Sequence, residues 1–209
     1  MTAARLTHVD EHGAARMVDV TAKDVTARTA SATGLLRVTP EVVGLLRGTG
    51  VPKGDALGTA RIAGIMGAKR TPDLVPLCHP IAISGVTVDL TVRDDGVEIT
   101  ATVRTADRTG VEMEALTAVT VAGLTLHDMV KAVDPGAELT GVRVLAKTGG
   151  RHGDWRAGPS REVVPTTPAG PAEAAEAAGP AEAAGPAEAA GPAEAAGPAE
   201  AAGPAEAVR

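Results

Sequence analysis

The feature that most constrains the fold is residues 110–134, which could form one long helix with apolar side chains around most of its circumference. The stretch contains no proline and a single internal glycine, Gly123, so its sequence is compatible with a continuous helix. A helix that is apolar nearly all round is buried on more than one side. We therefore expect one side to cover a sheet and the other to pack against a second helix or a second subunit.

Four charged residues stand out against this apolar background. Glu112 and Glu114 fall in the first turn, where carboxylates complement the helix dipole. Asp128 and Lys131 are three residues apart near the C-terminal end and therefore share a face. Helix capping plus a surface ion pair would explain these charges, and so would a functional site. The stretch by itself leaves both explanations open.

The C-terminal quarter of the chain differs in kind from the rest. From Pro168 onward it repeats a Gly-Pro-Ala-Glu-Ala-Ala hexamer. Regular prolines interrupt any helix, and alanine offers little apolar area to bury. We predict that residues 1–158 form one domain and that residues 159–209 form a disordered low-complexity tail.

Charge and composition narrow the classes of function. The net charge of −6 lies entirely in residues 159–209, so the predicted domain is neutral, and the chain has no Phe or Tyr. Both features argue against a nucleic-acid binder. Cys78 is the only cysteine, which excludes an internal disulfide and fits a reducing compartment. Because no run of about 18 apolar residues occurs, we expect a cytoplasmic protein without a membrane partner.

The remaining segments predict an α+β domain. Helices are expected from Pro40 after a Thr39 cap, and from an Asp55 cap to about residue 70. Strands are expected at residues 16–21, 28–38, 81–93, 97–105 and 138–147. Together they predict a ferredoxin-like fold with an antiparallel sheet of about four strands and helices packed on one face. The helix after Asp55 is rich in glycine and alanine, which favours close approach to another backbone and an oligomer.

Two basic segments are candidates for anion binding. Lys53 precedes a predicted helix N-terminus, where free N–H groups favour an anion. Residues 147–154, KTGGRHGD, could wrap a phosphate with backbone N–H groups and cations, although they do not form a P-loop. A solvated turn lysine and a flexible exit loop are the simpler alternatives.

A proline-punctuated loop at residues 71–80 contains Cys78 and His79 next to each other. Zinc needs three or four ligands, and no second cysteine or paired-histidine motif supplies them, so we expect no metal site. Adjacent side chains point apart, which disfavours a Cys–His nucleophile. We interpret His79 as a donor to an anion, with a satisfied loop histidine as the alternative.

Three long collinear segments carry a resemblance to a known family. The segments KGDALGTARIAGIMGAKRTPDLVPLCHP, TGVEMEALTAVTVAGLTLHDMVKAV and LAKTGGRHGDW resemble the signatures of the cyclic pyranopterin monophosphate synthase family. The resemblance covers residues 5–156 and implies a ferredoxin-like subunit in a homohexamer, a trimer of dimers with active sites at the dimer interface. It implies a lyase of molybdenum cofactor biosynthesis. The expected substrate is (8S)-3',8-cyclo-7,8-dihydroguanosine 5'-triphosphate, and the products are cyclic pyranopterin monophosphate and diphosphate.

The resemblance also implies roles for individual residues. Lys53 and Lys131 would be the acid/base groups, with Asp128 as the catalytic partner of Lys131. The expected substrate contacts are Leu77, Cys78, His79, Met113, Glu114, Glu112, Arg28, Lys69 and Lys147. No cofactor is expected beyond Mg²⁺ accompanying the substrate triphosphate. The competing hypothesis is a non-catalytic nucleotide-binding or assembly protein that keeps the same fold.

Overall fold

The computed structural model describes residues 6–48, 55–151 and 153–158. The strands are β1 (Thr26–Arg37), β2 (Ile83–Val92), β3 (Gly96–Asp107), β4 (Glu138–Thr148) and β5 (Trp155–Arg156). The helices are α1 (Pro40–Arg47), α2 (Ala56–Lys69), α3 (Thr71–Leu74) and α4 (Glu112–Val130). The predicted tail at residues 159–209 lies outside the described residues, as does Lys53.

The strands form one sheet in the order β2-β3-β1-β4-β5, and every neighbouring pair is antiparallel. The expectation of an antiparallel sheet is confirmed. The expected number of about four strands was wrong, because the short strand β5 adds a fifth. Glycines in left-handed conformation at positions 149, 150 and 153 reverse the chain after β4 and lay Trp155 beside Lys147.

The hairpin of β2 and β3 supplies much of the core. Its alternation places Val97, Ile99, Ala101 and Val103 of β3 on the buried face with no exposed surface. Val88 of β2 pairs with Ala101 in the register and is buried with it. The prediction of this pair of strands from their period-two pattern is confirmed.

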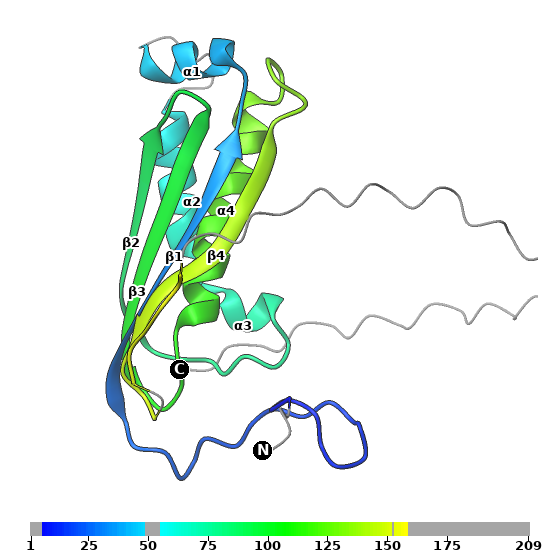
Figure 1. Cartoon of the computed structure of the whole chain (residues 1–209), viewed down its shortest axis with the longest axis vertical. Helices are drawn as coiled ribbons and strands as arrows, with labels where there is room; N and C mark the ends of the chain where they lie inside the picture. Colours follow the sequence, from blue (N-terminus) through cyan, green and yellow to red (C-terminus); the bar gives the residue numbers. More distant parts are fainter. Residues whose placement is uncertain (1–5, 49–54, 152, 159–209) are drawn as a thin grey trace, which may run out of the picture. The chain divides into compact units, whose positions relative to one another are not determined.

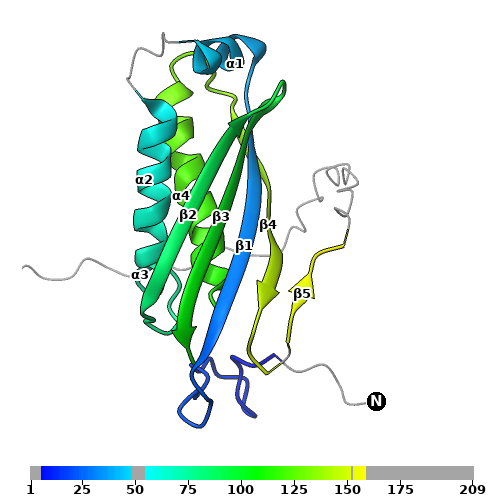
Figure 2. The same ribbon diagram turned by 90° about the vertical axis from the view of Figure 1, so that its left-hand side faces the viewer.

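Helices α2 and α4 cover one face of the sheet (Figures 1 and 2). Helix α4 packs on β1, β3 and β4 and lies beside α2, so the second helix expected from its apolar circumference is present. It is shorter than the stretch 110–134 from which it was predicted. The two helices approach closely, because a Cβ at Gly64 would lie 2.8 Å from the carbonyl oxygen of Ala118.

Local predictions around these helices have mixed outcomes. Asp55 caps α2 as expected, since its carboxylate accepts a hydrogen bond from the Gly58 N–H at 2.6 Å. Thr39 is the N-cap residue of α1, but its side chain makes no capping bond; its backbone N–H instead donates to the Asp134 carboxylate. The expected strand at residues 16–21 is wrong: these residues lie outside the sheet, and the chain just before them pairs with the N-terminal residues through the Val9–Ala15 bridge and the Arg16 N–H bond to the His8 carbonyl oxygen.

Within the described ranges, none of the helices combines the length and apolarity that crossing a bilayer requires.

Candidate active site

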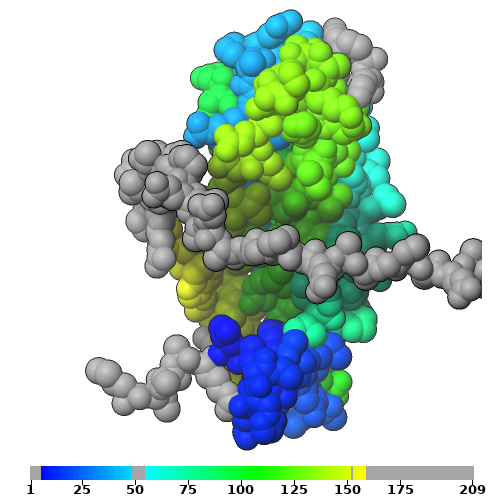
Figure 3. All heavy atoms as spheres, turned by 90° about the vertical axis from the view of Figure 1, so that its right-hand side faces the viewer, coloured from blue at the N-terminus to red at the C-terminus, as the bar shows by residue number. Residues whose placement is uncertain are grey.

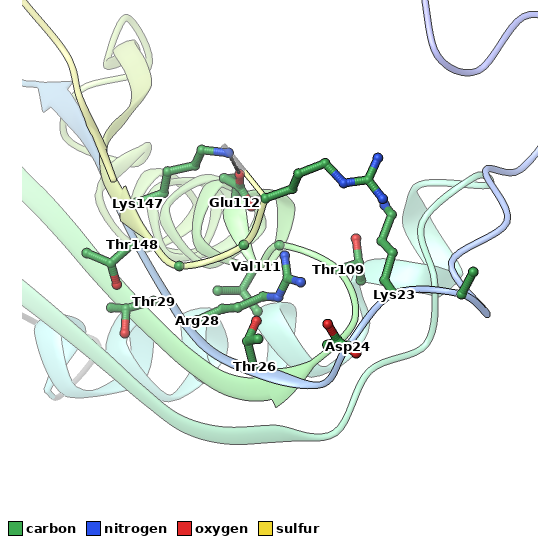
Figure 4. A pocket seen from close by; sticks show the side chains of 15 residues that line it. Lys23, Asp24, Thr26, Arg28, Thr29, Thr109, Val111, Glu112, Lys147 and Thr148 are labelled. Atoms are coloured by element: carbon green, nitrogen blue, oxygen red, sulfur yellow. Dashed lines mark ion pairs between the residues drawn. The ribbon is translucent and has the colours of Figure 1, made fainter. Parts of the chain in front are cut away.

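A hollow of about 520 Å³ lies at the end of the sheet where β1 begins and β4 ends. Figure 4 shows Arg28 reaching into it from β1, Lys147 paired with Glu112, and Lys23 on the other side. The remaining lining residues are Ala22, Asp24, Thr26, Thr29, Thr109, Gly110, Val111, Thr148, Gly149, Gly150 and Arg151. The cations Lys23, Arg28, Lys147 and Arg151 outnumber the lining carboxylates of Asp24 and Glu112, and this excess of positive charge suits a polyanionic ligand.

Two of these cations are held in place by partners. The Lys147 ammonium lies 3.1 Å from a Glu112 carboxylate oxygen, and both side chains are more than two-thirds buried. The Arg28 Nε donates to the carbonyl oxygen of Asp107 at 2.9 Å, which leaves the terminal guanidinium nitrogens for a ligand. Partly buried charges are screened less by salt than surface charges. The hollow therefore presents positioned cations.

The loop after β4 brings its backbone against this cluster. Gly149 and Gly150 have φ values of 83° and 79°, in the left-handed region that glycine adopts without strain. A Cβ at Gly150 would lie 2.6 Å from an Arg28 guanidinium nitrogen. Backbone N–H groups in such a turn can contact phosphate oxygens at close range.

A second hollow of about 370 Å³ adjoins the first. Both are lined by Lys23, Thr109, Gly110 and Glu112. The second is otherwise lined by Thr7, His8, Val18, Val20, Leu77, Cys78, His79, Met113 and Glu114. It is thus a mixed apolar and polar compartment, in contrast to the cationic first hollow.

Glu114 is the most perturbed titratable group in this compartment. Its residue surface is 3% exposed. Burial, with a smaller contribution from the neighbouring Glu112 charge, raises the pKa of the Glu114 carboxyl to about 7. Near neutral pH this group can either donate or accept a proton, which is the property of an acid/base or of an adaptable hydrogen-bonding group.

Cys78 lies in the same compartment as a free thiol. Burial first, and then the Glu114 charge, raise the pKa of the Cys78 thiol. A raised pKa keeps the thiol protonated, whereas a cysteine nucleophile needs a thiolate. The environment therefore favours a contact role for Cys78 over nucleophilic catalysis.

Asp128 and Lys131 lie at the opposite end of α4. The Lys131 ammonium is 2.6 Å from an Asp128 carboxylate oxygen, and the two side chains are 63% and 55% exposed. With a rise of 1.5 Å per residue, Lys131 is about 28 Å along the helix axis from Glu112. Helix α2 begins near the end of α4 that carries Lys131, because Ala56 packs in one cluster with Leu126 and Val130. Asp55, the described residue nearest in sequence to Lys53, directly precedes Ala56 and so lies at the same end.

The structure thus divides the expected site residues into two groups. One end of α4 collects the expected substrate contacts Arg28, Leu77, Cys78, His79, Glu112, Met113, Glu114 and Lys147. The other end carries Asp128 and Lys131, and Lys53 falls outside the described residues. Lys69 is exposed at the end of α2 and lines neither hollow.

Two basic side chains that line the hollows, Lys23 and His8, were not predicted from the sequence. Lys23 follows a turn and His8 lies in a polar arm, and neither has a local pattern that marks it as functional. Arg151 was included only as part of the glycine-rich loop, and it lines the first hollow. Among the described residues, no group of three or more His, Cys, Asp or Glu side chains could hold a metal ion.

The chain has many close relatives. Over 151 residues it is 76% identical to the cyclic pyranopterin monophosphate synthase of Streptomyces coelicolor, covering 72% of this chain and 89% of the relative. The identity is 75% to the Streptomyces avermitilis protein of the same name, with the same coverage. The Streptomyces griseus protein of that name is 68% identical over 170 residues, or 81% of this chain and 92% of the relative. The model of the MoaC family matches residues 17–150. Because the family model spans β1 to β4, α4 and most of the residues that line the two hollows, this chain belongs to the MoaC family.

Proposed function

We propose that this protein converts (8S)-3',8-cyclo-7,8-dihydroguanosine 5'-triphosphate into cyclic pyranopterin monophosphate and diphosphate. The observation that carries the proposal is the pair of adjoining hollows, one cationic and one containing a buried carboxyl group. A nucleoside triphosphate likewise has two parts: a polyanionic triphosphate, which suits the cationic hollow, and a heterocycle, which suits the hollow with the buried carboxyl group. The names of the close relatives support the same reaction.

The first hollow is assigned to the triphosphate. Lys23, Arg28, Lys147 and Arg151 supply positive charge, and the Gly149–Gly150 turn, whose Gly149 N–H donates to the Asp154 carboxylate, lies beside them. In the reaction, a sugar hydroxyl oxygen forms a bond to the α-phosphorus, and the bond from that phosphorus to the bridging oxygen of the β-phosphate breaks. Cations around the leaving diphosphate stabilise the charge that develops on it.

The second hollow is assigned to the guanine-derived ring. Amino and ring N–H groups of that heterocycle are donors, and the carboxyl groups of Glu112 and Glu114 are acceptors when ionised. Because the pKa of Glu114 is raised to about 7, this group can also give a proton to the ring as it rearranges.

Acid/base catalysis is assigned to Lys53, Asp128 and Lys131. The Asp128 carboxylate at 2.6 Å orients the Lys131 ammonium. An exposed ion pair of this kind contributes at most about 1 kcal/mol to stability, so folding alone gives little reason for it. These residues can act on a substrate bound in the hollows only if the C-terminal end of α4 in one subunit lies against the N-terminal end of α4 in another subunit.

A homohexamer built as a trimer of dimers provides this meeting. In one subunit the two groups of residues are separated by most of the length of α4. The outer surface of the helical layer carries the exposed apolar side chains of Ile62, Met66 and Leu124, which are 61%, 53% and 61% exposed. Such a surface suits a subunit interface. The order β-α-β-β-α-β and the sheet order β2-β3-β1-β4 likewise support the ferredoxin-like class.

The test is incubation of the purified protein with the cyclised GTP derivative, with diphosphate and the pterin product measured together. The wild-type protein is expected to form both in equal amounts, and Lys131→Ala is expected to form neither. Arg47→Met is a matched control, because Arg47 pairs with Asp94 at the same end of the molecule as another exposed ion pair. A wild-type protein that forms neither product, or a fully active Lys131→Ala variant, would contradict the assignment.

A further inference from the structure

The N-terminal arm, defined here as residues 6–16, forms part of the wall of the second hollow. Thr7 and His8 line it together with Cys78, His79 and Glu114. In the space-filling view the N-terminal residues, coloured blue, lie against the residues that follow α2 (Figure 3). The arm is thus the only part of this wall that lies outside the region matched by the family model, which begins at residue 17.

The arm has a defined fold of its own. The Asp10 carboxylate accepts hydrogen bonds from the N–H groups of His12 and Ala14, at 2.8 Å and 2.9 Å. An isolated bridge joins Val9 to Ala15. In the described part of the chain, the hydrogen bonds made by residues 8–16 all run within that segment. The arm therefore presents His8 from a preformed turn.

The His8 side chain is oriented within this turn. Its backbone carbonyl accepts a hydrogen bond from the Arg16 N–H at 3.0 Å, and its ring Nδ1 lies 3.3 Å from the Arg16 carbonyl oxygen. A carbonyl oxygen only accepts, so Nδ1 must carry the proton in this contact. The bond made by one ring nitrogen fixes the role of the other, which leaves Nε2 to meet a ligand.

We infer that the arm belongs to the ligand site and that His8, through Nε2, hydrogen-bonds the heterocycle of the bound ligand. The inference rests on the proposed function, because it assigns the guanine-derived ring to the second hollow. His8 is exposed and lines the second hollow. A ring bound between His8 and Glu114 would cover it. His8 is accordingly a binding residue that contacts the substrate in the ground state and in the transition state alike.

The test compares histidine variants of the same arm in steady-state kinetics. His8→Leu removes both ring nitrogens, and loss of one hydrogen bond to the substrate is expected to raise KM about tenfold with little change in kcat. His8→Gln keeps a polar group at a similar reach and is expected to restore most of the affinity. His12→Leu is the matched control, since His12 lies in the same turn and lines neither hollow.

Each outcome decides the inference. It is supported if only His8→Leu raises KM while the unfolding transitions of all variants stay unchanged. It is overturned if His8→Leu has the KM of the wild type, or if His12→Leu raises KM equally. In either case the proposed function still stands, because the wild-type protein forms product. If the wild-type protein forms no product, the proposed function fails and this inference fails with it.

Discussion

At the scale of single residues, the site depends on charges that the fold places in unusual surroundings. Glu114 lies in the first turn of α4 but is almost fully buried, and Glu112, two residues before it, pairs with Lys147 from β4. Burial raises the pKa of Glu114 and so favours its protonated form, whereas Glu112 is held by its ion pair with Lys147. Two glutamates two positions apart can therefore serve different roles.

Glu114 should make stability depend on pH. Its folded-state pKa of about 7 lies above the ordinary value of 4.5, so the folded protein binds more protons than the unfolded chain between these values. Stability from this group is fully present below about pH 4.5 and is lost as the pH rises through 7, by an amount on the order of 3 kcal/mol. The free energy of unfolding of Glu114→Gln should therefore exceed that of the wild type at pH 8. At pH 5 this difference between the two proteins should be smaller.

Urea unfolding of both proteins at pH 5 and pH 8, at one fixed protein concentration, measures this difference. The m-values should agree, so that the midpoints report stability. A difference between the two proteins that is the same at both pH values would show that Glu114 is ionised in the folded state throughout.

Lys147 should act through the triphosphate. Lys147→Met keeps the bulk of the side chain but removes the charge in the first hollow. Loss of a charge-assisted hydrogen bond of about 1.5–3 kcal/mol should weaken binding roughly 10- to 100-fold. Inhibition by added diphosphate, measured as an inhibition constant, should weaken in parallel. Arg143→Met on the same strand is the control, because Arg143 is exposed and lines neither hollow; equal effects of the two substitutions would refute a specific contact.

At the scale of elements, α2 and α4 pack through small residues. Ala60, Gly64 and Ala68 of α2 are buried, as are Ala118 and Ala122 of α4. Because the residues at these positions are small, the backbones of the two helices come close together. The close approach at Gly64 depends on the absence of a Cβ atom there. Glycine destabilises a helix because of its low helix propensity, and the close packing of α2 on α4 offsets this loss of stability.

Two glycine-to-alanine substitutions should have opposite effects. In Gly64→Ala the new Cβ would lie 2.8 Å from the Ala118 carbonyl oxygen, which should destabilise the protein by about 1–3 kcal/mol. In Gly44→Ala, within α1, nothing lies within 4 Å of the new Cβ. That substitution should stabilise by about 0.5–1 kcal/mol. Urea unfolding of both variants is the measurement, and stabilisation by Gly64→Ala would show that α2 and α4 do not pack as closely as described.

At the scale of the whole molecule, α4 separates the two halves of the proposed site. The hollows lie at its N-terminal end and the Asp128–Lys131 pair at its C-terminal end. A rigid helix of this length cannot bring its own ends together. A shared site in which each subunit contributes one end to its neighbour is the arrangement that the geometry favours.

Mixed assemblies should reveal this sharing. Lys131→Ala and Lys147→Met alter opposite ends of α4, so a subunit of each kind can form one site with neither substitution. Mixing and re-equilibrating equal amounts should recover roughly a quarter of wild-type activity if subunits pair at random in dimers with two shared sites. Mixing Lys131→Ala with Asp128→Ala, which alter the same end, should recover none. Equal activity in both mixtures would exclude a site shared across subunits.

Much of the fold could be predicted from local pattern. The alternation from Val97 to Val103 after the Asp94-Asp95-Gly96 turn predicted the β2–β3 hairpin, and Asp55 predicted the start of α2. The segment at residues 16–21 shows the limit of this reasoning. Its alternating apolar residues fit a strand, but Val18 and Val20 line a hollow instead. Whether a strand forms depends on an available neighbouring edge, which the local sequence does not contain.

The sequence alone predicted which residues belong to the candidate site better than it predicted how those residues are arranged in space. The motif blocks identified the family, and eight of the nine substrate contacts that the resemblance implies line the two hollows, because residue type and order carry that information directly. The tertiary structure decided which residues lie together in one subunit: Lys23 and His8 line the hollows, Lys69 lines neither of them, and Asp128 and Lys131 lie at the far end of α4. The physical reason is that side-chain chemistry is local to the chain, whereas proximity depends on how the sheet and helices pack over long sequence separations.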